Sequence, residues 1–243
     1  AIGGVVDSYS MDGSYYDFSA SGYNIVSDQG AASLFENLEV KAFKGITYGI
    51  QYEGSLTISN GVRVEAMNYI GILSNSGSQY FENSYAGNCG YLSILVNNIS
   101  GTSNLGSRFL YRGGTVDESS GGSLEVTSST DVVFVGTILF GAVDYYGAKI
   151  NASSVATFIG CQIVPYGTGN RGGLQVVSTG TAILTGCRLD GSGTLYAVDN
   201  AGVVIDALGN TIGTTNGTAP VSTASTIQSK TSGGLTIEAS NGT

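Results

Sequence analysis

The sequence predicts an all-β protein built as a parallel β-helix, a single-stranded solenoid with coils of about 22–26 residues. Three observations predict this fold. A short apolar segment with a shared glycine recurs along the chain, and a second strand-like segment precedes each copy at nearly the same distance. Both segments alternate in hydrophobicity and favour Val, Ile, Phe and Thr, and no helical stripe of about ten residues interrupts them.

The glycine-containing segment reads VVFVGTILF at 132–140, ATFIGCQIV at 156–164 and AILTGCRLD at 182–190. The shared glycines are Gly136, Gly160 and Gly186, and a fourth copy supplies Gly209. Because side chains alternate between the two faces of a strand, two columns should point into the core: Phe134, Phe158 and Leu184, then Leu139, Ile163, Leu189 and Ile212. The column between them should point outward: Ile138, Gln162, Arg188 and Thr211.

The second segment begins at Leu124, Ala148, Leu174 and Tyr196 in successive coils. Its inward column is predicted to be Val126, Ile150, Val176 and Val198. Its outward column is predicted to be Glu125, Lys149, Gln175 and Ala197, with Glu125 and Lys149 forming a surface ion pair. Each coil should lie on the next by parallel pairing at about 4.8 Å.

Two of the three cysteines occupy one position of the repeat. Cys161 and Cys187 follow the shared glycine on adjacent coils, where Thr137 stands before them and Asn210 after them. A ladder of small buried side chains is one interpretation. A disulfide between coils is the other, because the spacing of neighbouring strands falls within the usual Cα separation of a disulfide.

The repeat suggests three regions. Residues 1–32 would be an N-terminal cap or lead-in, residues 33–213 the solenoid, and residues 214–243 a Ser/Thr/Gly-rich cap, linker or start of a further domain. No apolar run approaches the ~18 residues of a membrane-spanning helix, and no signal peptide is visible.

Composition limits the partners. The 9 Lys and Arg against 18 Asp and Glu give a net charge of −9, which argues against nucleic acid as a partner. Charged residues are only 11% of the chain, so many outward positions must be uncharged or apolar. Such a surface is often covered by other subunits or by a ligand.

The sequence carries little catalytic chemistry. It has no histidine, which excludes Ser-His-Asp and Cys-His catalysis and His-ligated metals. It has no phosphate-binding or dinucleotide-binding motif, so we expect no cofactor and no metal. The weak catalytic candidates are Asp144 and Asp190, which lie two coils apart, about 10 Å along the axis.

Carbohydrate binding has better support from the loops that follow the Leu139, Ile163 and Leu189 column. These loops should gather side chains whose aromatic faces and polar groups suit a sugar: Tyr145, Tyr146, Tyr166, Arg171 and Tyr196. A second aromatic cluster is expected at Tyr80, Phe81, Tyr85 and Tyr91, either exposed to a ligand or packed on the solenoid or at a subunit seam.

Coils ending in GCQIV, GCRLDG and LGNTIG resemble those of the right-handed parallel β-helices of the pectin-lyase-like superfamily, over roughly residues 33–213. The low charge and the high Gly and Ser content look most like its bacteriophage tailspike and fibre members. The resemblance implies a homotrimer that contacts other virion proteins and binds, and sometimes cleaves, host-surface polysaccharide.

The leading hypothesis is therefore a virion structural protein, a fibre, spike or decoration protein that binds a host-surface glycan or receptor without cleaving it. It would be found on the virion or outside the cell. One alternative is a polysaccharide lyase or glycoside hydrolase of the tailspike type. The other is a secreted bacterial adhesin or filament subunit.

Overall fold

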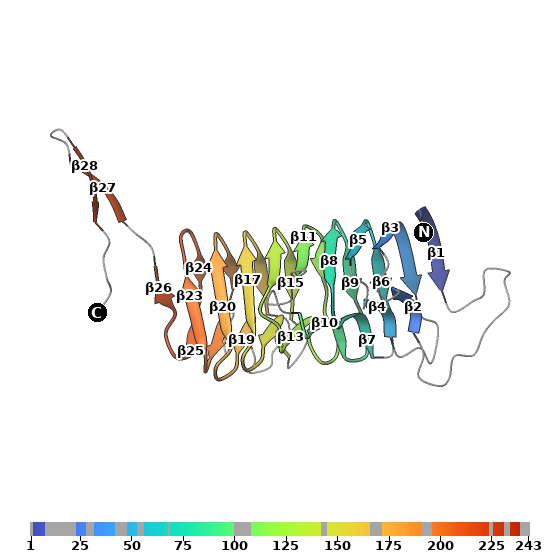
Figure 1. The fold of residues 1–243 in the computed structure, drawn as a ribbon. Coiled ribbons are helices and arrows are strands. Elements are labelled where there is room, and N and C mark those ends of the chain that lie inside the picture. The colour runs from blue at the N-terminus through green and yellow to red at the C-terminus, as the bar shows by residue number, and fades with distance from the viewer. Residues whose placement is uncertain are drawn as a thin grey trace.

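The computed structural model describes residues 2–7, 23–27, 32–41, 48–52, 56–67, 69–99, 108–141, 145–165, 172–190, 196–223, 226–230 and 234–238. Regular structure within these ranges is β-strand, and the strands wind into a parallel solenoid (Figure 1). The predicted fold class is confirmed.

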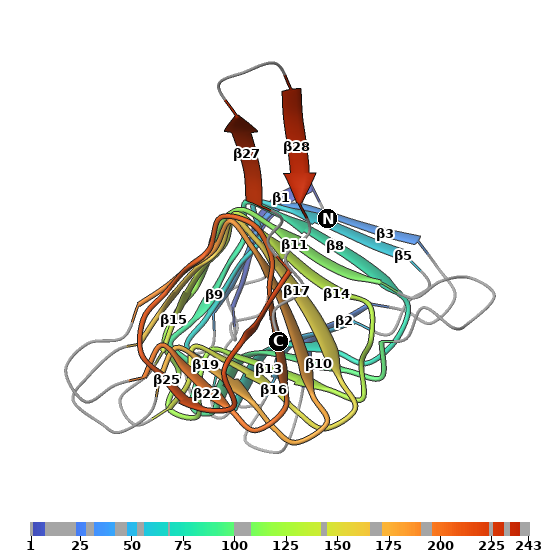
Figure 2. The same cartoon turned by 90° about the vertical axis from the view of Figure 1, so that its left-hand side faces the viewer.

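Each coil has three faces, which give the solenoid a roughly triangular section in Figure 2. Face 1 is formed by the first half of β3 (Ala32–Lys41), β5 (Leu56–Asn60), β8 (Ser78–Glu82), β11 (Phe109–Arg112), β14 (Val132–Val135), β17 (Val155–Ile159), β20 (Thr181–Thr185), β23 (Val203–Asp206) and β26 (Val221–Ser222). Face 2 is formed by the second half of β3, β6 (Arg63–Glu65), β9 (Tyr85–Gly87), β12 (Thr115–Val116), β15 (Ile138–Phe140), β18 (Gln162–Val164), β21 (Arg188–Leu189) and β24 (Thr211–Ile212). Face 3 is formed by β2 (Tyr23–Ser27), β4 (Tyr48–Tyr52), β7 (Ile70–Ser74), β10 (Leu92–Asn97), β13 (Leu124–Thr127), β16 (Ala148–Ile150), β19 (Leu174–Val176), β22 (Val198–Asn200) and β25 (Thr215–Gly217).

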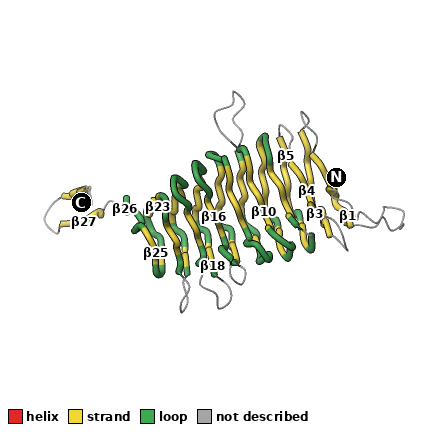
Figure 3. Tube along the Cα trace, turned by 90° about the horizontal axis from the view of Figure 1, so that it is seen from below, coloured by secondary structure: helices red, strands yellow, loops and turns green. Residues whose placement is uncertain are grey.

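Neighbouring coils pair in parallel along all three faces, so they lie side by side along the axis in Figure 3. In Figure 2 the chain runs counterclockwise from face 1 through face 2 to face 3 while it advances toward the viewer, which makes the coil right-handed. Parallel pairing also includes β1 (Ile2–Asp7) and β2 at one end, and β25 and β26 at the other. Beyond β26, β27 (Thr226–Lys230) and β28 (Gly234–Glu238) pair antiparallel.

The bend between faces 1 and 2 has a residue in the left-handed conformation at the same position of successive coils. The predicted column of shared glycines lies at this bend, with φ between 59° and 81° at Gly136, Gly160, Gly186 and Gly209. Earlier coils place Asn37, Gly61, Asn83 and Gly113 at the bend, also with positive φ. Glycine adopts this conformation without a Cβ clash, and asparagine tolerates it better than most residues, which explains the two residue types.

A stack of aromatic rings fills the core behind face 1. Phe81, Tyr111, Phe134 and Phe158 occupy equivalent strand positions, and successive ring centroids lie 5.4–5.7 Å apart. Ser59 occupies the same column one coil before Phe81 and leaves room there. The ring of Tyr52 enters from face 3, 5.1 Å from Phe81, and its hydroxyl lies 3.2 Å from the Ser59 hydroxyl.

The predicted columns of faces 1 and 2 are confirmed residue by residue. Phe134, Phe158 and Leu184 pair in register and are fully buried. The column from Leu139 to Ile212 pairs in the same way, as does the outward column from Ile138 to Thr211.

The register of the last face 3 segment was predicted two residues too early. Leu174 pairs with Val198 instead of Tyr196, and Val176 pairs with Asn200 instead of Val198. The outward partner of Gln175 is therefore Asp199, whereas Ala197 is buried beside the corner. A shift of two residues preserves the inward-outward alternation of the strand, so alternation alone could not detect it. Ala197 changes from predicted outward to buried because it precedes the strand instead of belonging to it.

Cys161 and Cys187 lie together at the bend, as predicted, and both are buried free thiols. The Arg188 amide donates to the Cys161 carbonyl at 2.9 Å, and the Thr211 amide donates to the Cys187 carbonyl at 2.8 Å. The neighbouring Cys187 thiol, together with burial, raises the pKa of Cys161, and the Cys187 thiol donates to the Phe158 carbonyl at 3.2 Å. The ladder of small side chains is confirmed, and no disulfide joins the coils.

Candidate functional site

A column of polar side chains runs along the outer surface of face 3. Paired strand positions bring five of them into line: Glu125, Lys149, Gln175, Asp199 and Asn216. We call this column the polar ladder. Its side chains stand about 4.8 Å apart because each belongs to the next coil of a parallel sheet.

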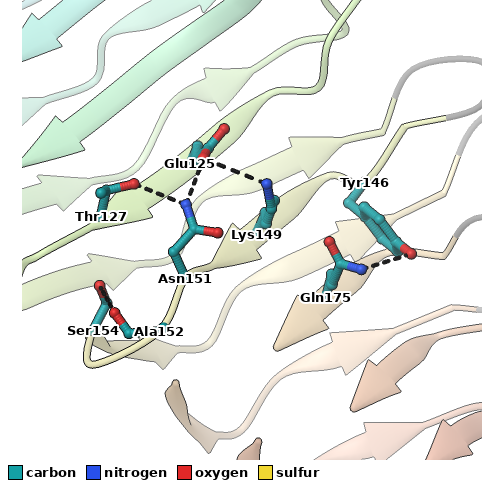
Figure 4. A network of polar contacts seen from close by, with 8 residues as sticks. All are labelled: Glu125, Thr127, Tyr146, Lys149, Asn151, Ala152, Ser154 and Gln175. Carbon is teal, nitrogen blue, oxygen red and sulfur yellow. Dashed lines mark hydrogen bonds and ion pairs between the residues drawn. The ribbon is translucent and has the colours of Figure 1, made fainter. Parts of the chain in front are cut away.

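The first half of the polar ladder is held by Glu125. Its carboxylate lies 3.5 Å from the Lys149 ammonium, which confirms the predicted ion pair (Figure 4). The Asn151 side-chain amide donates to Glu125 and also to the Thr127 hydroxyl, at 2.8 Å from the latter. These contacts fix the carboxylate and amide groups on a partly exposed surface.

The second half is held by Tyr146, which reaches across two coils. Its hydroxyl donates to the Asp199 carboxylate at 2.7 Å, and the Gln175 amide donates to that hydroxyl at 3.0 Å. Asn216 donates to the other Asp199 oxygen at 3.0 Å. Tyr146 is buried, and the hydrogen bonds of its hydroxyl hold Gln175 and Asp199 of the polar ladder in place.

Three further tyrosines form an aromatic shelf beside the polar ladder. The tyrosines are Tyr69, Tyr91 and Tyr145. Each precedes by three residues an inward residue of face 3, and these inward residues, Ile72, Ile94 and Ala148, belong to one column of paired strand positions. The three tyrosines are therefore at equivalent positions of the coil. The rings of Tyr69 and Tyr91 are stacked, with centroids 4.9 Å apart and planes 10° apart. Tyr69 is 40% exposed and Tyr145 39%, so the shelf presents ring surface to solvent.

The shelf needs a glycine at its centre. Gly121 occupies the equivalent position on the coil between Tyr91 and Tyr145, and a Cβ there would lie 2.4 Å from the Tyr91 ring. Burial raises the pKa of Tyr91, and the Glu125 carboxylate, Tyr69 and Tyr145 add to the shift. The shelf and the start of the polar ladder are thus close neighbours.

A cavity of about 80 Å³ lies where the two features meet. Its lining includes Tyr91, Tyr145 and Tyr146 from the aromatic side, and Glu125, Lys149 and Gln175 from the polar ladder. Aromatic faces and a small set of fixed polar groups therefore converge on one hollow, which is the usual composition of a small-ligand site.

The structure brings together only some of the predicted site residues. Tyr145 and Tyr146 both line the cavity. Tyr196 precedes β22, where its carbonyl accepts a hydrogen bond from the Gly173 amide, and it is partly exposed. Asp144, Tyr166 and Arg171 lie outside the described residues.

The weak catalytic candidate Asp190 belongs to the outer side of face 2. Its carboxylate accepts a hydrogen bond from Arg188 Nε at 2.9 Å. On the polar ladder, Glu125 and Asp199 are separated by three coils, about 14 Å, which exceeds the ~6.5–9.5 Å of an inverting glycosidase pair. Among the described residues, no group of three or more acids or cysteines is placed to hold a metal ion.

The second predicted aromatic cluster does not form. Tyr80 points outward from face 1 and Phe81 inward, Tyr85 lies on face 2 with Arg63 4.2 Å from its ring centroid, and Tyr91 belongs to the aromatic shelf. Residues this close in sequence disperse because alternation and the bend at Asn83 send them to different faces.

Sequence reasoning missed Tyr69 and the role of Asp199. The irregular spacing of the early coils concealed the equivalence of Tyr69 and Tyr145. A column of small residues at the corner before face 3, with Gly147, Gly173 and Ala197 in it, would have given the correct register for Asp199.

No protein-family model, curated protein or solved structure matches the chain. In the portion that the structure describes, no helix is long and apolar enough to cross a membrane.

Proposed function

We propose that the protein is a non-enzymatic glycan-binding solenoid of a virion fibre, spike or decoration protein, and that it contacts host-surface polysaccharide through the aromatic shelf and the polar ladder. The observation that carries the proposal is the shelf itself. Tyr69, Tyr91 and Tyr145 present partly exposed rings at equivalent positions of the coil repeat.

The chemistry of the two features suits a sugar chain. Tyrosine offers an apolar ring face to the C–H surface of a sugar and a hydroxyl to its polar edge. The polar ladder beside it supplies carboxylate, ammonium and amide groups that match sugar hydroxyls as acceptors and donors. Since both features run along the solenoid axis, a linear glycan would lie parallel to that axis.

Binding without cleavage is favoured by how the acids are held. Asp199 accepts hydrogen bonds from Tyr146, Gln175 and Asn216, while Glu125 accepts from Asn151 and pairs with Lys149. Acids engaged in this way and separated by three coils suit recognition better than paired acid–base work.

The virion setting is supported by the low charge and the high Gly and Ser content, which resemble those of bacteriophage tailspikes and fibres within the superfamily that the coil endings resemble. The assembly proposed with it is a homotrimer that contacts other virion proteins, on the virion or outside the cell.

The test is titration calorimetry against a panel of bacterial capsular and cell-wall polysaccharides, with wild-type protein and the double variant Tyr91→Ala/Tyr145→Ala. We expect at least one polysaccharide to bind the wild type and the double variant to lose about tenfold or more in affinity, because each buried ring face contributes about 1 kcal/mol or more.

The matched control is Tyr85→Ala, which removes a partly exposed tyrosine from face 2 and should leave binding unchanged. Unchanged affinity in the double variant would contradict the proposed site. Release of oligosaccharides from any polysaccharide would favour the enzymatic alternative.

A further inference from the structure

The outer surface of face 1 is the most apolar part of the described molecule. Five of the eight large hydrophobic residues that are exposed in the described chain lie on this face: Leu34, Ile58, Ile159, Val203 and Val221. A soluble rod would expose scattered apolar residues at random, but these share neighbouring columns of one sheet.

The central outward column of face 1 is apolar from end to end apart from Thr157. Paired strand positions place its members in line from β3 to β26, and they include Leu34, Ile58, Tyr80, Leu110, Val133 and Ile183. We call this column the apolar stripe. It continues through Ile205 to Val221.

A groove of about 460 Å³ lies on the stripe near its N-terminal end. Its lining is mostly apolar, with the ion-paired Glu82 and Arg112 at its edge, and the apolar residues are Leu56, Ile58, Tyr80, Phe81 and Leu110. The groove gives the stripe a recess into which protruding apolar side chains of a partner can pack.

We propose that face 1 is the surface through which copies of this chain associate side by side. The first argument is geometric. The stripe is straight, runs along the solenoid axis and repeats at every coil, so its partner must be an apolar ridge of similar length and repeat. A second copy of the chain presents such a ridge.

The second argument is electrostatic. Copies that each carry a net charge of −9 repel one another, so they can meet closely only through a surface with little net charge. Face 1 meets this condition along most of its length, because Arg108 pairs with Asp131 at 3.1 Å and Arg112 with Glu82 at 3.4 Å within the same chain.

The third argument is area. Nine strands at about 4.8 Å spacing and about 14 Å mean length give roughly 600 Å² of sheet per copy, before side chains are added. Two such faces bury about 1,200 Å² or more together, which reaches the size of a stable, specific interface. The inference specifies the contact surface of the assembly proposed above, but it rests on face 1 alone and needs no glycan.

The test is sedimentation and light scattering of the full chain without any glycan, for wild type and for Ile58→Glu and Ile183→Glu. We expect the wild type to form an oligomer and each variant to weaken association about a hundredfold or more, because an unpaired charge would be buried against an apolar partner. The control is Gln162→Glu, which adds the same charge on the outer side of face 2 and should assemble like the wild type.

Circular dichroism and melting of each variant show whether it is folded, and two variants at separate coils keep the test valid if one of them is not. A wild type that stays monomeric up to its solubility limit would overturn the inference. Folded variants that assemble as well as the wild type would overturn it too, because association would then use another face. Either result would leave the glycan site on face 3 untouched.

Discussion

Gly160 combines a left-handed backbone with open space where a side chain would lie. Its φ is 60°, and a Cβ at this residue would meet no atom within 4 Å. The requirement for glycine is therefore conformational and owes nothing to crowding. The same holds at Gly136, one coil earlier.

Gly160→Ala should reduce the free energy of unfolding by about 1–2 kcal/mol, the strain of an alanine in the left-handed region. Gly160→Asn should cost less, because asparagine already occupies the equivalent bend at Asn83. Urea denaturation of the two variants checks this order. An alanine variant as stable as the asparagine variant would show that the bend can relax.

Buried phenols make stability fall at high pH. Burial raises the pKa of Tyr52 and of Tyr111 well above the ordinary value of about 10. Above pH ~10 the unfolded chain releases the phenol protons while the folded chain keeps them. The contribution of the two buried phenols to the free energy of unfolding is therefore complete below pH ~10 and is lost as the pH rises further.

We expect each of the two phenols to lower the free energy of unfolding by about 1.4 kcal/mol per pH unit above pH ~10. Urea denaturation at a series of alkaline pH values measures the slope. Tyr111→Phe should make the slope shallower, and an identical slope in that variant would contradict the assignment.

At the scale of the element, the side chains of the polar ladder project from successive short strands of face 3 and hold one another through hydrogen bonds and an ion pair. Tyr146 links three of these strands, from its own coil to Gln175 and Asp199. Tyr146→Phe should cost about 1–3 kcal/mol, because Asp199 loses a charge-assisted hydrogen bond in a partly buried place. The chemical denaturation midpoint gives the measurement.

Tyr85→Phe provides the comparison for Tyr146→Phe. The Tyr85 hydroxyl also donates to a carboxylate, that of Asp117 at 2.9 Å, but it lies on face 2 away from the ladder. Both variants should lose stability, whereas only Tyr146→Phe should weaken glycan binding. Loss of binding in both would show that the effect is not specific to the ladder.

The register of the strands on faces 1 and 2 could be predicted from the sequence, whereas the register of the last strands on face 3 could not. The strands of faces 1 and 2 were predicted in register because each carries a glycine at a conformationally required bend. Face 3 has no such marker, and the predicted register of the segment around Val198 was wrong by two residues, a shift that preserves the alternation of the strand. The aromatic shelf was only partly predicted, because Tyr69 lies in coils whose spacing is irregular.

At the scale of the whole molecule, the solenoid is a one-dimensional stack in which each coil pairs with its two neighbours. Stability should therefore be nearly additive for distant coils. Val64 and Phe158 are both fully buried, and they belong to coils about 19 Å apart along the axis.

The double variant Val64→Ala/Phe158→Ala should lose the sum of the two single losses within about 0.5 kcal/mol. The matched pair Phe134→Ala/Phe158→Ala should depart from additivity, because those rings are neighbours with centroids 5.6 Å apart. A double-mutant cycle in urea measures both. A large departure from additivity between Val64 and Phe158 would contradict the expectation that distant coils contribute independently to the free energy of unfolding.

The left-handed bend also bears on how such a chain can change in length over generations. Every coil turns at an equivalent residue and meets its neighbours through the same ladder of amides. A tandem duplication of the gene segment for one winding would add about 4.8 Å to the rod while the adjoining windings kept their contacts. The reach of this protein can therefore evolve in discrete steps, one winding at a time.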